Sequence, residues 1–486
     1  MILGGCGAPG GRLTFPYRPV VASASSQWFD VDRNGRDDFA LAFDPAGKLE
    51  ALHYDDDEDG RPDRTYRPRD FSADSVPHLV ILLDSVPFAR VAERHATGEF
   101  RWFDGPPTKV IPPFPSLTEV CYTELLRAPP LPGLIDQHYD ARAKRIHNGL
   151  WDRAIRGHRH PWERSLHYRS DFLDEGFAYL NPRSWYAAEL ERARRALERS
   201  PDRTTIVYLT SASAMACKFG RRGIDEVLDG AAQLCLQLLH ERRGAVKISL
   251  MADHGHNMVP SKNIRVDEVL RRGGFRATER LGGADDVVLE VNGLVTYAAV
   301  RTTRPAAVAA ALLREPGIDM AAHLEGERVL VRGAGGTAAI DARDGKLRYR
   351  AETCDVLGYG GTIDALRRGE KLHADGFASR DDWFAATADH EYPDAPARLW
   401  DAFHGQAINT PEVMFTTRDG YTAGLASFER FITMNSTHGS LNQLNSATFL
   451  LTMTGRAPAA RPLRIGEVMA QIAPDWRPRV VLGVKR

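Results

Sequence analysis

The chain has 486 residues, a hydrophobic fraction of 43%, a charged fraction of 26% and a formal net charge of -1. These values are typical of a globular protein with one large core or two to three domains. The small net charge gives no signal for nucleic acid or an anionic membrane, and no apolar run approaches the ~20 residues of a transmembrane segment. The five cysteines form no CxxC pair, so neither a disulfide framework nor a cysteine-based zinc module is predicted.

The first residues, Met1-Ile-Leu-Gly-Gly-Cys6, resemble the end of a bacterial lipoprotein signal. In that interpretation Cys6 carries a lipid anchor. The positively charged region and the long apolar region that normally precede such a cysteine are missing. A trimmed start and a chance match are therefore the two alternatives.

Residues 1–75 form a distinct N-terminal segment with two similar acidic loops, Asp30–Asp38 and Asp55–Asp63, and a predicted hairpin of residues 39–43 and 49–54. Alternate oxygen ligands suit a hard cation, and a glycine at the sixth position permits the sharp turn. Neither loop has the glutamate of an EF-hand at its twelfth position, and solvated acidic turns are the alternative. The repeated pattern favours calcium and an extracytoplasmic location, periplasmic or secreted. The predicted Ca²⁺ ligands are Asp30, Asp32, Asn34 and Asp38 in the first loop, and Asp55, Asp57, Asp59 and Asp63 in the second.

From residue 76 onward, strands alternate with helices, which predicts an α/β fold with a mainly parallel sheet and helices on both faces. Strands are predicted at 78–83, 204–209 and 246–251, and helices at 88–94, 187–199 and 224–240. Residues 142–181 are rich in Arg, His and Trp, which predicts an excursion over the surface. A smaller α+β insert is predicted at about 265–400, with strands in 286–300, 328–332 and 346–350 around a hairpin turn at 341–345.

Four segments of this chain contain residues that suit catalysis. Asp84 ends an apolar strand, and residues 111–118 form a proline-rich loop that ends on a hydroxyl. Asp253-His254-Gly255 follows another apolar strand, and His438-Gly439 lies in a late loop. Each segment alone is a weak signal, but the carboxyl ends of strands in an open α/β sheet are where sites gather.

The order of these segments resembles the alkaline phosphatase superfamily. The loop 114–118 is similar to the nucleophile loop of the type I phosphodiesterase/nucleotide pyrophosphatase branch, and residues 133–140 are similar to the stretch that follows it. The resemblance covers roughly residues 76–475, leaving 476–486 as a tail. It implies an alkaline-phosphatase-like fold and a small-molecule phosphate ester as substrate. It also implies two divalent ions, usually Zn²⁺, about 4 Å apart.

The resemblance implies a complete first metal site. Its ligands are Asp84, Asp253, His254 and the hydroxyl of Thr118, which is the nucleophile that forms a phospho-enzyme; Ser116 is the reserve candidate for that role.

The second metal site departs from the family pattern of an Asp and a His four residues apart, followed by a late His. Ser213 stands in place of the Asp and Cys217 in place of the His, and only His438 matches. Gln137 replaces the asparagine that faces the phosphate. Cysteine can bind zinc as a thiolate, but a buried structural cysteine is the commoner case.

Two functions follow from this departure. The first is a metal-dependent phosphate ester hydrolase, in which His438, Cys217 or another residue completes the second site; further candidate ligands are His256, Asp225 and the stretch His158-Arg-His160. The second is an impaired or ligand-binding protein that keeps the fold and one metal. The substrate stays open among phosphate monoesters, diesters, pyrophosphates, phosphonates and sulfates.

Overall fold

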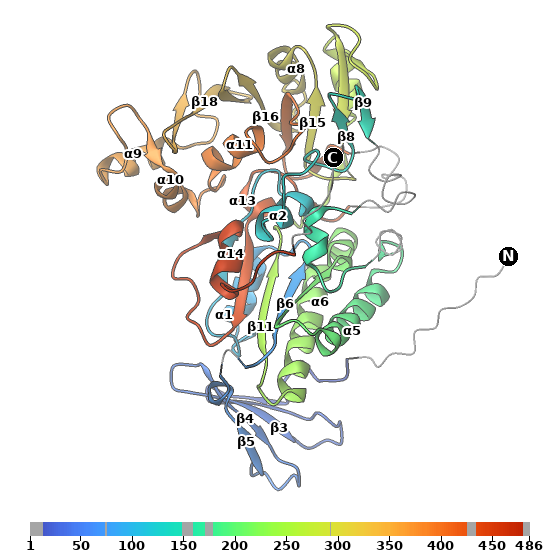
Figure 1. The fold of residues 1–486 in the computed structure, drawn as a ribbon, viewed down its shortest axis with the longest axis vertical. Helices are drawn as coiled ribbons and strands as arrows, with labels where there is room; N and C mark the ends of the chain where they lie inside the picture. Colours follow the sequence, from blue (N-terminus) through green and yellow to red (C-terminus); the bar gives the residue numbers. More distant parts are fainter. Residues whose placement is uncertain are drawn as a thin grey trace, which may run out of the picture.

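The structure is a computed structural model, and it describes residues 13–72, 75–147, 159–170, 178–291, 293–424 and 434–479. Cys6 lies outside these residues, so the lipid anchor stays a prediction. Within the described ranges, no helix has both the length and the apolar character needed to cross a membrane. Figure 1 shows three parts along the long axis: a small N-terminal sheet, a central sheet with its helices, and a second large sheet.

The central sheet has six strands, and all but one point the same way. Strand β6 pairs in parallel with β10 and β11, and β24 pairs in parallel with β7, whereas β23 is antiparallel to both of its neighbours. The prediction of a mainly parallel sheet is confirmed. In spatial order the strands are β10 (Thr204–Leu209), β6 (His78–Leu83), β11 (Lys247–Ala252), β23 (Thr448–Met453), β7 (Thr108–Ile111) and β24 (Leu463–Arg464).

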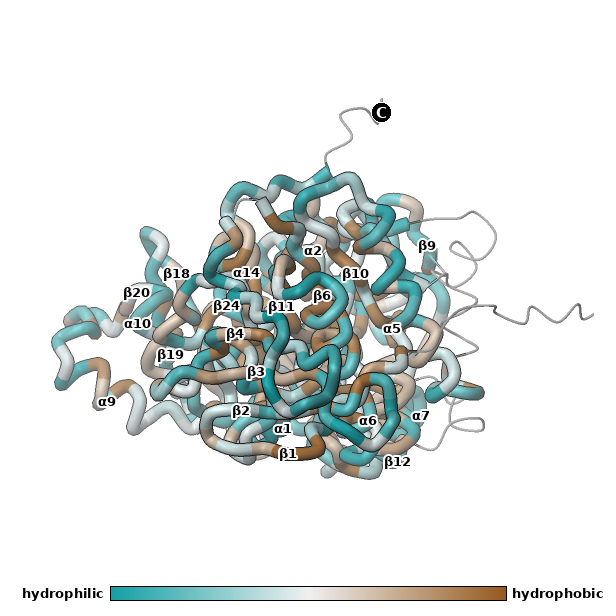
Figure 2. Tube along the Cα trace, turned by 90° about the horizontal axis from the view of Figure 1, so that it is seen from below, coloured by the Kyte–Doolittle hydropathy of each residue, from teal (hydrophilic) through white to brown (hydrophobic). Residues whose placement is uncertain are grey.

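Helices cover both faces of the central sheet, as predicted. On one face Leu79 and Ile81 of β6 pack with helices α1, α5 and α6, and on the other Val80 and Leu82 pack with α2 and α14. Figure 2 shows apolar segments concentrated near β6 and β10, inside more polar ones. The helices are α1 (Phe88–Ala96), α2 (Thr118–Leu125), α5 (Pro182–Arg199), α6 (Ser211–Glu241) and α14 (Ile465–Ile472).

Helix α6 begins at Ser211, 13 residues before the predicted start at Ile224. Its two parts join at Gly220, whose φ of 56° is unfavourable for other residues. A side chain there would also bring its Cβ to 3.3 Å from the carbonyl oxygen of Asn435. The break at Gly220 concealed the first part of the helix in the sequence, and that part carries Ser213 and Cys217.

The predicted insert forms a nine-stranded sheet, antiparallel except between its first two strands. Helices α7 and α8 pack on one face, and α9, α10 and α11 pack on the other. In spatial order the strands are β13 (Arg276–Ala277), β14 (Asp286–Glu290), β15 (Tyr297–Arg301), β21 (Val413–Thr417), β16 (Ile318–Glu325), β17 (Arg328–Gly333), β18 (Gly336–Arg343), β19 (Lys346–Ala351) and β20 (Ala378–Ser379). The helices are α7 (Val266–Arg272), α8 (Pro305–Leu312), α9 (Gly360–Arg368), α10 (Arg380–Thr387) and α11 (Ala395–Phe403).

One detail of the predicted insert is wrong. The turn at 341–345 was expected to join the strands now seen as β17 and β19, but β18 lies between them and pairs with both. The turn is confined to Asp344-Gly345, where both residues have positive φ. Strand β21 also extends this sheet beyond residue 400.

The N-terminal sheet is an antiparallel meander, and the predicted hairpin is confirmed as β3 and β4. Phe39 and Tyr54 pack against His240 near the end of α6, and the Tyr54 hydroxyl donates to the His240 carbonyl oxygen at 2.7 Å. This end of α6 is the one away from Ser211. The strands are β1 (Val21–Ala22), β2 (Ser26–Phe29), β3 (Phe39–Phe43), β4 (Leu49–Tyr54) and β5 (Arg64–Tyr66). Short elements complete the described chain: η1 (Pro68–Asp70), β8 (His138–Asp140), β9 (Arg145–His147), η2 (Pro161–Ser165), β12 (Lys262–Asn263), β22 (Tyr421–Thr422) and α13 (Gln443–Ser446).

Candidate active site

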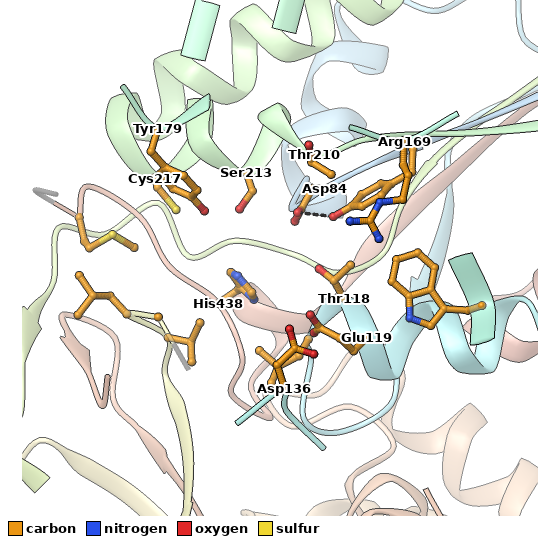
Figure 3. A pocket seen from close by; sticks show the side chains of 17 residues that line it. Asp84, Thr118, Glu119, Asp136, Arg169, Tyr179, Thr210, Ser213, Cys217 and His438 are labelled. Atoms are coloured by element: carbon orange, nitrogen blue, oxygen red, sulfur yellow. Dashed lines mark hydrogen bonds between the residues drawn. The ribbon is translucent and has the colours of Figure 1, made fainter. Parts of the chain in front are cut away.

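A pocket of about 250 Å³ lies at the carboxyl end of the central sheet (Figure 3). Asp84 and Asp253 come side by side because the last residues of their strands, Leu83 and Ala252, are paired in register. The walls of the pocket are formed by residues at the ends of strands and by the first turns of α2 and α6. The lining residues used below are Asp84, Thr118, Arg169, Ser213, Cys217 and His438.

The four residues expected at the first metal site converge. Asp84, Asp253 and His254 each offer a ligand atom, and these atoms lie within 4.8 Å of one another. His254 Nε2 is 3.3 Å from Asp253 Oδ2 and 3.9 Å from Asp84 Oδ1. The Thr118 hydroxyl is 3.5 Å from the same nitrogen. Two carboxylates, an imidazole and a hydroxyl form a donor set that suits a divalent ion.

The electrostatics of this group also fit a cation. Asp253 Oδ1 accepts from the backbone N–H groups of Ser85 and His254 at 3.0 and 2.9 Å, but no atom of the described residues meets hydrogen-bond geometry with the buried Oδ2. Burial raises the pKa of Asp253 to about 7. Burial, and then the nearby charge of Asp253, raise the pKa of Asp84 well above its usual value. Among the described residues, neither carboxylate pairs with Lys or Arg, so a cation would supply the missing charge.

The imidazole of His254 is in the state that a metal needs. Burial lowers its pKa to about 4, so the ring is neutral near pH 7. Its Nδ1 donates to the carbonyl oxygen of Gly255 at 3.0 Å, which leaves Nε2 directed toward the two carboxylates. Such an outer hydrogen bond orients a ligating histidine.

Two hydroxyl groups hold Asp84 in place. Tyr208 donates to Oδ2 at 2.7 Å and Ser85 donates to Oδ1 at 2.5 Å. Tyr208 lies in the buried strand β10, within an apolar run, so this role could not be predicted from the sequence. Its position next to β6 in the sheet is what brings its hydroxyl to Asp84.

Thr118 is placed as a nucleophile would be, whereas the reserve candidate Ser116 is not. Thr118 is the first residue of α2, where the helix dipole favours negative charge. Ser116 is fully buried and does not line the pocket. Its hydroxyl lies 3.3 Å from the carbonyl oxygen of Ser440 and accepts from Arg398 Nη2 at 2.9 Å. We therefore interpret Ser116 as a structural residue.

Arg398 is a positioning residue that the sequence did not reveal. It is 3% exposed, and it reaches the site from α11 of the second sheet. Besides Ser116, it donates to the carbonyl oxygen of Leu441 at 2.8 Å. The arginine thus ties the loop that precedes Thr118 to the loop that carries His438.

The second half of the expected metal site does not fit an ion. Ser213 and Cys217 line the pocket as the alignment expected, but neither is charged. Burial, and then the charge of Asp84, raise the pKa of Cys217 to about 12, so its thiol stays protonated near pH 7. The Cys217 sulfur lies 3.8 Å from His256 Nε2. Among the described residues, no group of three ligands includes Cys217 or His438.

His438 remains next to the first site. Its ring stacks on that of His254 with the centroids 4.0 Å apart, and its Nδ1 donates to the carbonyl oxygen of Ser116 at 3.1 Å. The other candidate ligands divide. His256 is buried beside this ring, whereas Asp225 of α6 pairs with Arg90 of α1 at 2.5 Å and does not line the pocket.

Glu119, Asp136 and His160 form another group with ligand atoms within 4.8 Å of one another. Glu119 and Asp136 line the pocket, and His160 Nε2 lies 2.6 Å from Asp136 Oδ1. Asp136 lines the pocket and its neighbour Gln137 does not, so the role predicted for Gln137 toward the substrate stays a prediction.

The segment 142–181 is not simply a surface excursion where it is described. Trp162 is 2% exposed and packs against Tyr122 and Tyr208. Arg169 lines the pocket and pairs with the buried Glu163 at 2.5 Å. The density of tryptophan and arginine was the signal in the sequence, and it left a solvated surface and the binding of an anionic leaving group as equal alternatives.

No family model and no curated protein matches the chain. Among solved structures, the chain is similar to phosphonoacetate hydrolase from Sinorhizobium meliloti 1021 in complex with phosphonoacetate (TM-score 0.42, 12% identity, 84% of this chain and 96% of that chain). It is also similar to human ectonucleotide pyrophosphatase/phosphodiesterase 5 (TM-score 0.40, 9% identity, 82% of this chain and 96% of that chain). With TM-scores below 0.5, the similarity assigns no activity or substrate to this chain.

Zinc should stabilise the protein more at pH 7.5 than at pH 5.5. With its pKa at about 7, Asp253 is mostly ionised at the higher pH, and at the lower pH the ion must displace a proton at a cost of about 2 kcal/mol. In the metal-free protein, this raised pKa lowers stability as the pH rises from about 4 to 7, and a bound cation removes that loss. Melting temperatures with and without zinc measure the effect. Equal shifts at both pH values, or an unchanged response in Asp253→Asn, would contradict the assignment.

Proposed function

We propose that this protein is a metal-dependent hydrolase of phosphate esters in which Thr118 is the nucleophile. The observation that carries the proposal is the buried Oδ2 of Asp253, unpartnered within the described residues, surrounded by Asp84 and His254 and close to the Thr118 hydroxyl. A fold without catalysis has no need for a hydroxyl at a helix start beside a full ligand set.

In the proposed hydrolysis, each residue of the site has a separate role. A divalent ion held by Asp84, Asp253 and His254 would favour the ionised form of a neighbouring hydroxyl. The Thr118 oxygen then attacks phosphorus and its proton passes to solvent, while the bond from phosphorus to the leaving-group oxygen breaks and that oxygen takes up a proton from solvent. Water hydrolyses the resulting phosphothreonine and restores the hydroxyl. Throughout, Tyr208 and Ser85 hold Asp84, and the start of α2 favours negative charge on the phosphoryl group.

The pocket supports an anionic substrate of modest size. Arg169 contributes a cationic side chain to the wall, and its partner Glu163 is 7% exposed. A guanidinium group suits phosphate geometry because it can donate two parallel hydrogen bonds. Phosphate esters are the class we propose, with phosphonates and sulfates as alternatives that a substrate panel would separate.

The second function, an impaired or ligand-binding protein with one metal, is favoured by a specific observation. Ser213 and the protonated Cys217 stand where the resemblance expects two ligands. A metal content of one ion or fewer near this pocket, together with an absence of turnover, would select it over hydrolysis.

We also propose that both N-terminal loops bind calcium. The loops share one hydrogen-bond pattern: Gly35 N–H donates to Asp30 Oδ2 at 2.9 Å, and Gly60 N–H donates to Asp55 Oδ2 at 2.8 Å. Oxygen atoms of Asp55, Asp57 and Asp59 lie within 4.8 Å of one another. Calcium loops are consistent with an extracytoplasmic location, where this ion is plentiful, and we propose that location with them.

Replacing the nucleophile should remove hydrolysis. Thr118→Ala should lower turnover of a nitrophenyl phosphodiester at least a thousandfold, whereas Thr118→Ser keeps a hydroxyl and should retain part of it. Thr123→Ala is the matched control and should keep activity, because this hydroxyl of the same helix lies outside the pocket and makes no hydrogen bond within the described residues. Release of nitrophenol measures all three, and undiminished turnover in Thr118→Ala would contradict the assignment.

Restoring the expected ligands should strengthen the second half-site. The double variant Ser213→Asp/Cys217→His adds a carboxylate and an imidazole beside His438, and about three protein ligands are what a catalytic zinc site needs. We expect one more zinc ion per chain and at least tenfold faster hydrolysis. Elemental analysis and nitrophenol release test both. A parent protein that already holds two ions near the pocket and turns over rapidly would contradict the loss of this half-site.

Calcium should raise the melting temperature through the N-terminal loops. At a calcium concentration 100 times Kd, each occupied site adds ~2.7 kcal/mol of stability. Parent protein freed of calcium should therefore melt several degrees higher once the ion is returned. Asp32→Ala/Asp57→Ala should lose this response, and Asp364→Ala/Asp389→Ala, which removes two exposed acids elsewhere, should keep it. If the loop variant responds as the parent does, the loops are acidic turns.

A further inference from the structure

Asp419 lies in the turn between β21 and β22, where its carboxylate accepts hydrogen bonds from three side-chain amides. Its Oδ1 accepts from Asn257 Nδ2 and from Asn445 Nδ2, both at 2.8 Å, and its Oδ2 accepts from Asn442 Nδ2 at 3.3 Å. Asn257 is 3% exposed and Asn445 is fully buried. Buried amides need partners for their polar atoms, so this carboxylate is a strong constraint on how the asparagines lie.

Asn257 joins the two loops that carry His254 and His438. Its backbone N–H donates to the carbonyl oxygen of Thr437 at 2.9 Å, and its side-chain Oδ1 accepts from the Thr437 N–H at 3.0 Å. The second bond requires the amide oxygen of Asn257 to face Thr437. An ionised carboxylate only accepts, so Asp419 keeps the NH₂ group of this amide toward itself and the oxygen toward Thr437.

Asn445 gives Asp419 a second route to the loop of His438. The Asn445 Nδ2 donates to Asp419, and its Oδ1 accepts from the Thr296 hydroxyl at 3.1 Å. The Thr296 N–H donates in turn to the carbonyl oxygen of His438 at 2.8 Å. One carboxylate therefore constrains the backbone of this loop through Asn257 and through Asn445.

The placement of these loops determines how the imidazoles of the candidate site lie. The rings of His254 and His438 stack with their centroids 4.0 Å apart. The His254 ring is oriented by the carbonyl oxygen of Gly255, two residues before Asn257. Because such an outer hydrogen bond fixes the direction of a ligating nitrogen, a shift of residues 255–257 would turn the His254 Nε2 away from the two carboxylates.

We propose that Asp419 is a positioning residue that fixes the loops of His254 and His438 against each other. It does not line the pocket, and it acts through the amides of Asn257 and Asn445. Its effect on metal affinity rests on the proposed metal site, whereas the joining of the two loops does not.

Two measurements on the full chain test this role. Calorimetric titration with zinc should show about tenfold weaker binding in Asp419→Ala, as for the loss of other groups around metal ligands. The loss should be smaller in Asp419→Asn, which keeps one acceptor oxygen. Hydrogen exchange followed by mass spectrometry should show faster exchange in Asp419→Ala for peptides that cover 254–258 and 435–442. A residue that contributes only to overall stability would lower the melting temperature and leave both readouts unchanged.

Asp104→Ala is the matched control. Asp104 is half-buried, as Asp419 is, and its Oδ2 accepts from the backbone N–H groups of Thr454 and Gly455 at 2.7 and 3.2 Å. These two residues follow β23, which runs antiparallel to β11, so they lie at the end of the central sheet away from the pocket. Zinc affinity in the control should stay within twofold of the parent. Melting temperatures establish that the variants fold, and Asp419→Asn decides the question if Asp419→Ala does not.

Parent-like zinc affinity in the Asp419 variants would overturn the proposal. An equal loss in Asp104→Ala would assign the effect to general destabilisation and would overturn it as well. If the parent does not bind zinc, the proposed metal site fails, and hydrogen exchange decides the role of Asp419 by itself. Faster exchange confined to the two loops then supports this role, and unchanged exchange contradicts it.

Discussion

Two carboxylates that lie together out of water, with no Lys or Arg of the described chain paired to either, impose the central constraint on this molecule. Asp84 and Asp253 repel each other, and burial makes their ionised forms costly, so their pKa values rise. Asp253 Oδ2, unpartnered within the described residues, and the neutral His254 nitrogen face the same point. A bound cation would offset the repulsion between the carboxylates and would give Asp253 Oδ2 and the His254 nitrogen a common partner.

Other parts of the structure hold Asp84, Asp253 and His254 in this arrangement. The parallel register of β6 and β11 sets the two carboxylates side by side, and β10 adds the Tyr208 hydroxyl. Arg398 crosses from the second sheet to join the two loops that carry Thr118 and His438. The second sheet is therefore part of the site's support, and the N-terminal sheet packs at the far end of α6.

The sequence predicted features that depend on local pattern. Continuous apolar runs located the strands, and acidic or imidazole groups at their ends located Asp84, Asp253 and His254. It missed β18, whose flanking glycines and small side chains lack a strong strand pattern, and the start of α6, which Gly220 separates from the rest. Tyr208 and Arg398 could not be found this way, because their roles depend on contacts between segments far apart in the chain.

The two halves of the pocket differ in how firmly they are expected to hold a metal ion. One half has a charged donor set, and the other presents the uncharged Ser213 and Cys217, so the first ion should be held far more firmly than a second. Anomalous X-ray scattering from crystals grown with zinc tests this most directly. The account predicts a strong peak within ~2.0–2.2 Å of Asp84, Asp253 and His254, and a weak peak or none between His438 and Cys217. A protein with no peak at Asp253 would contradict it.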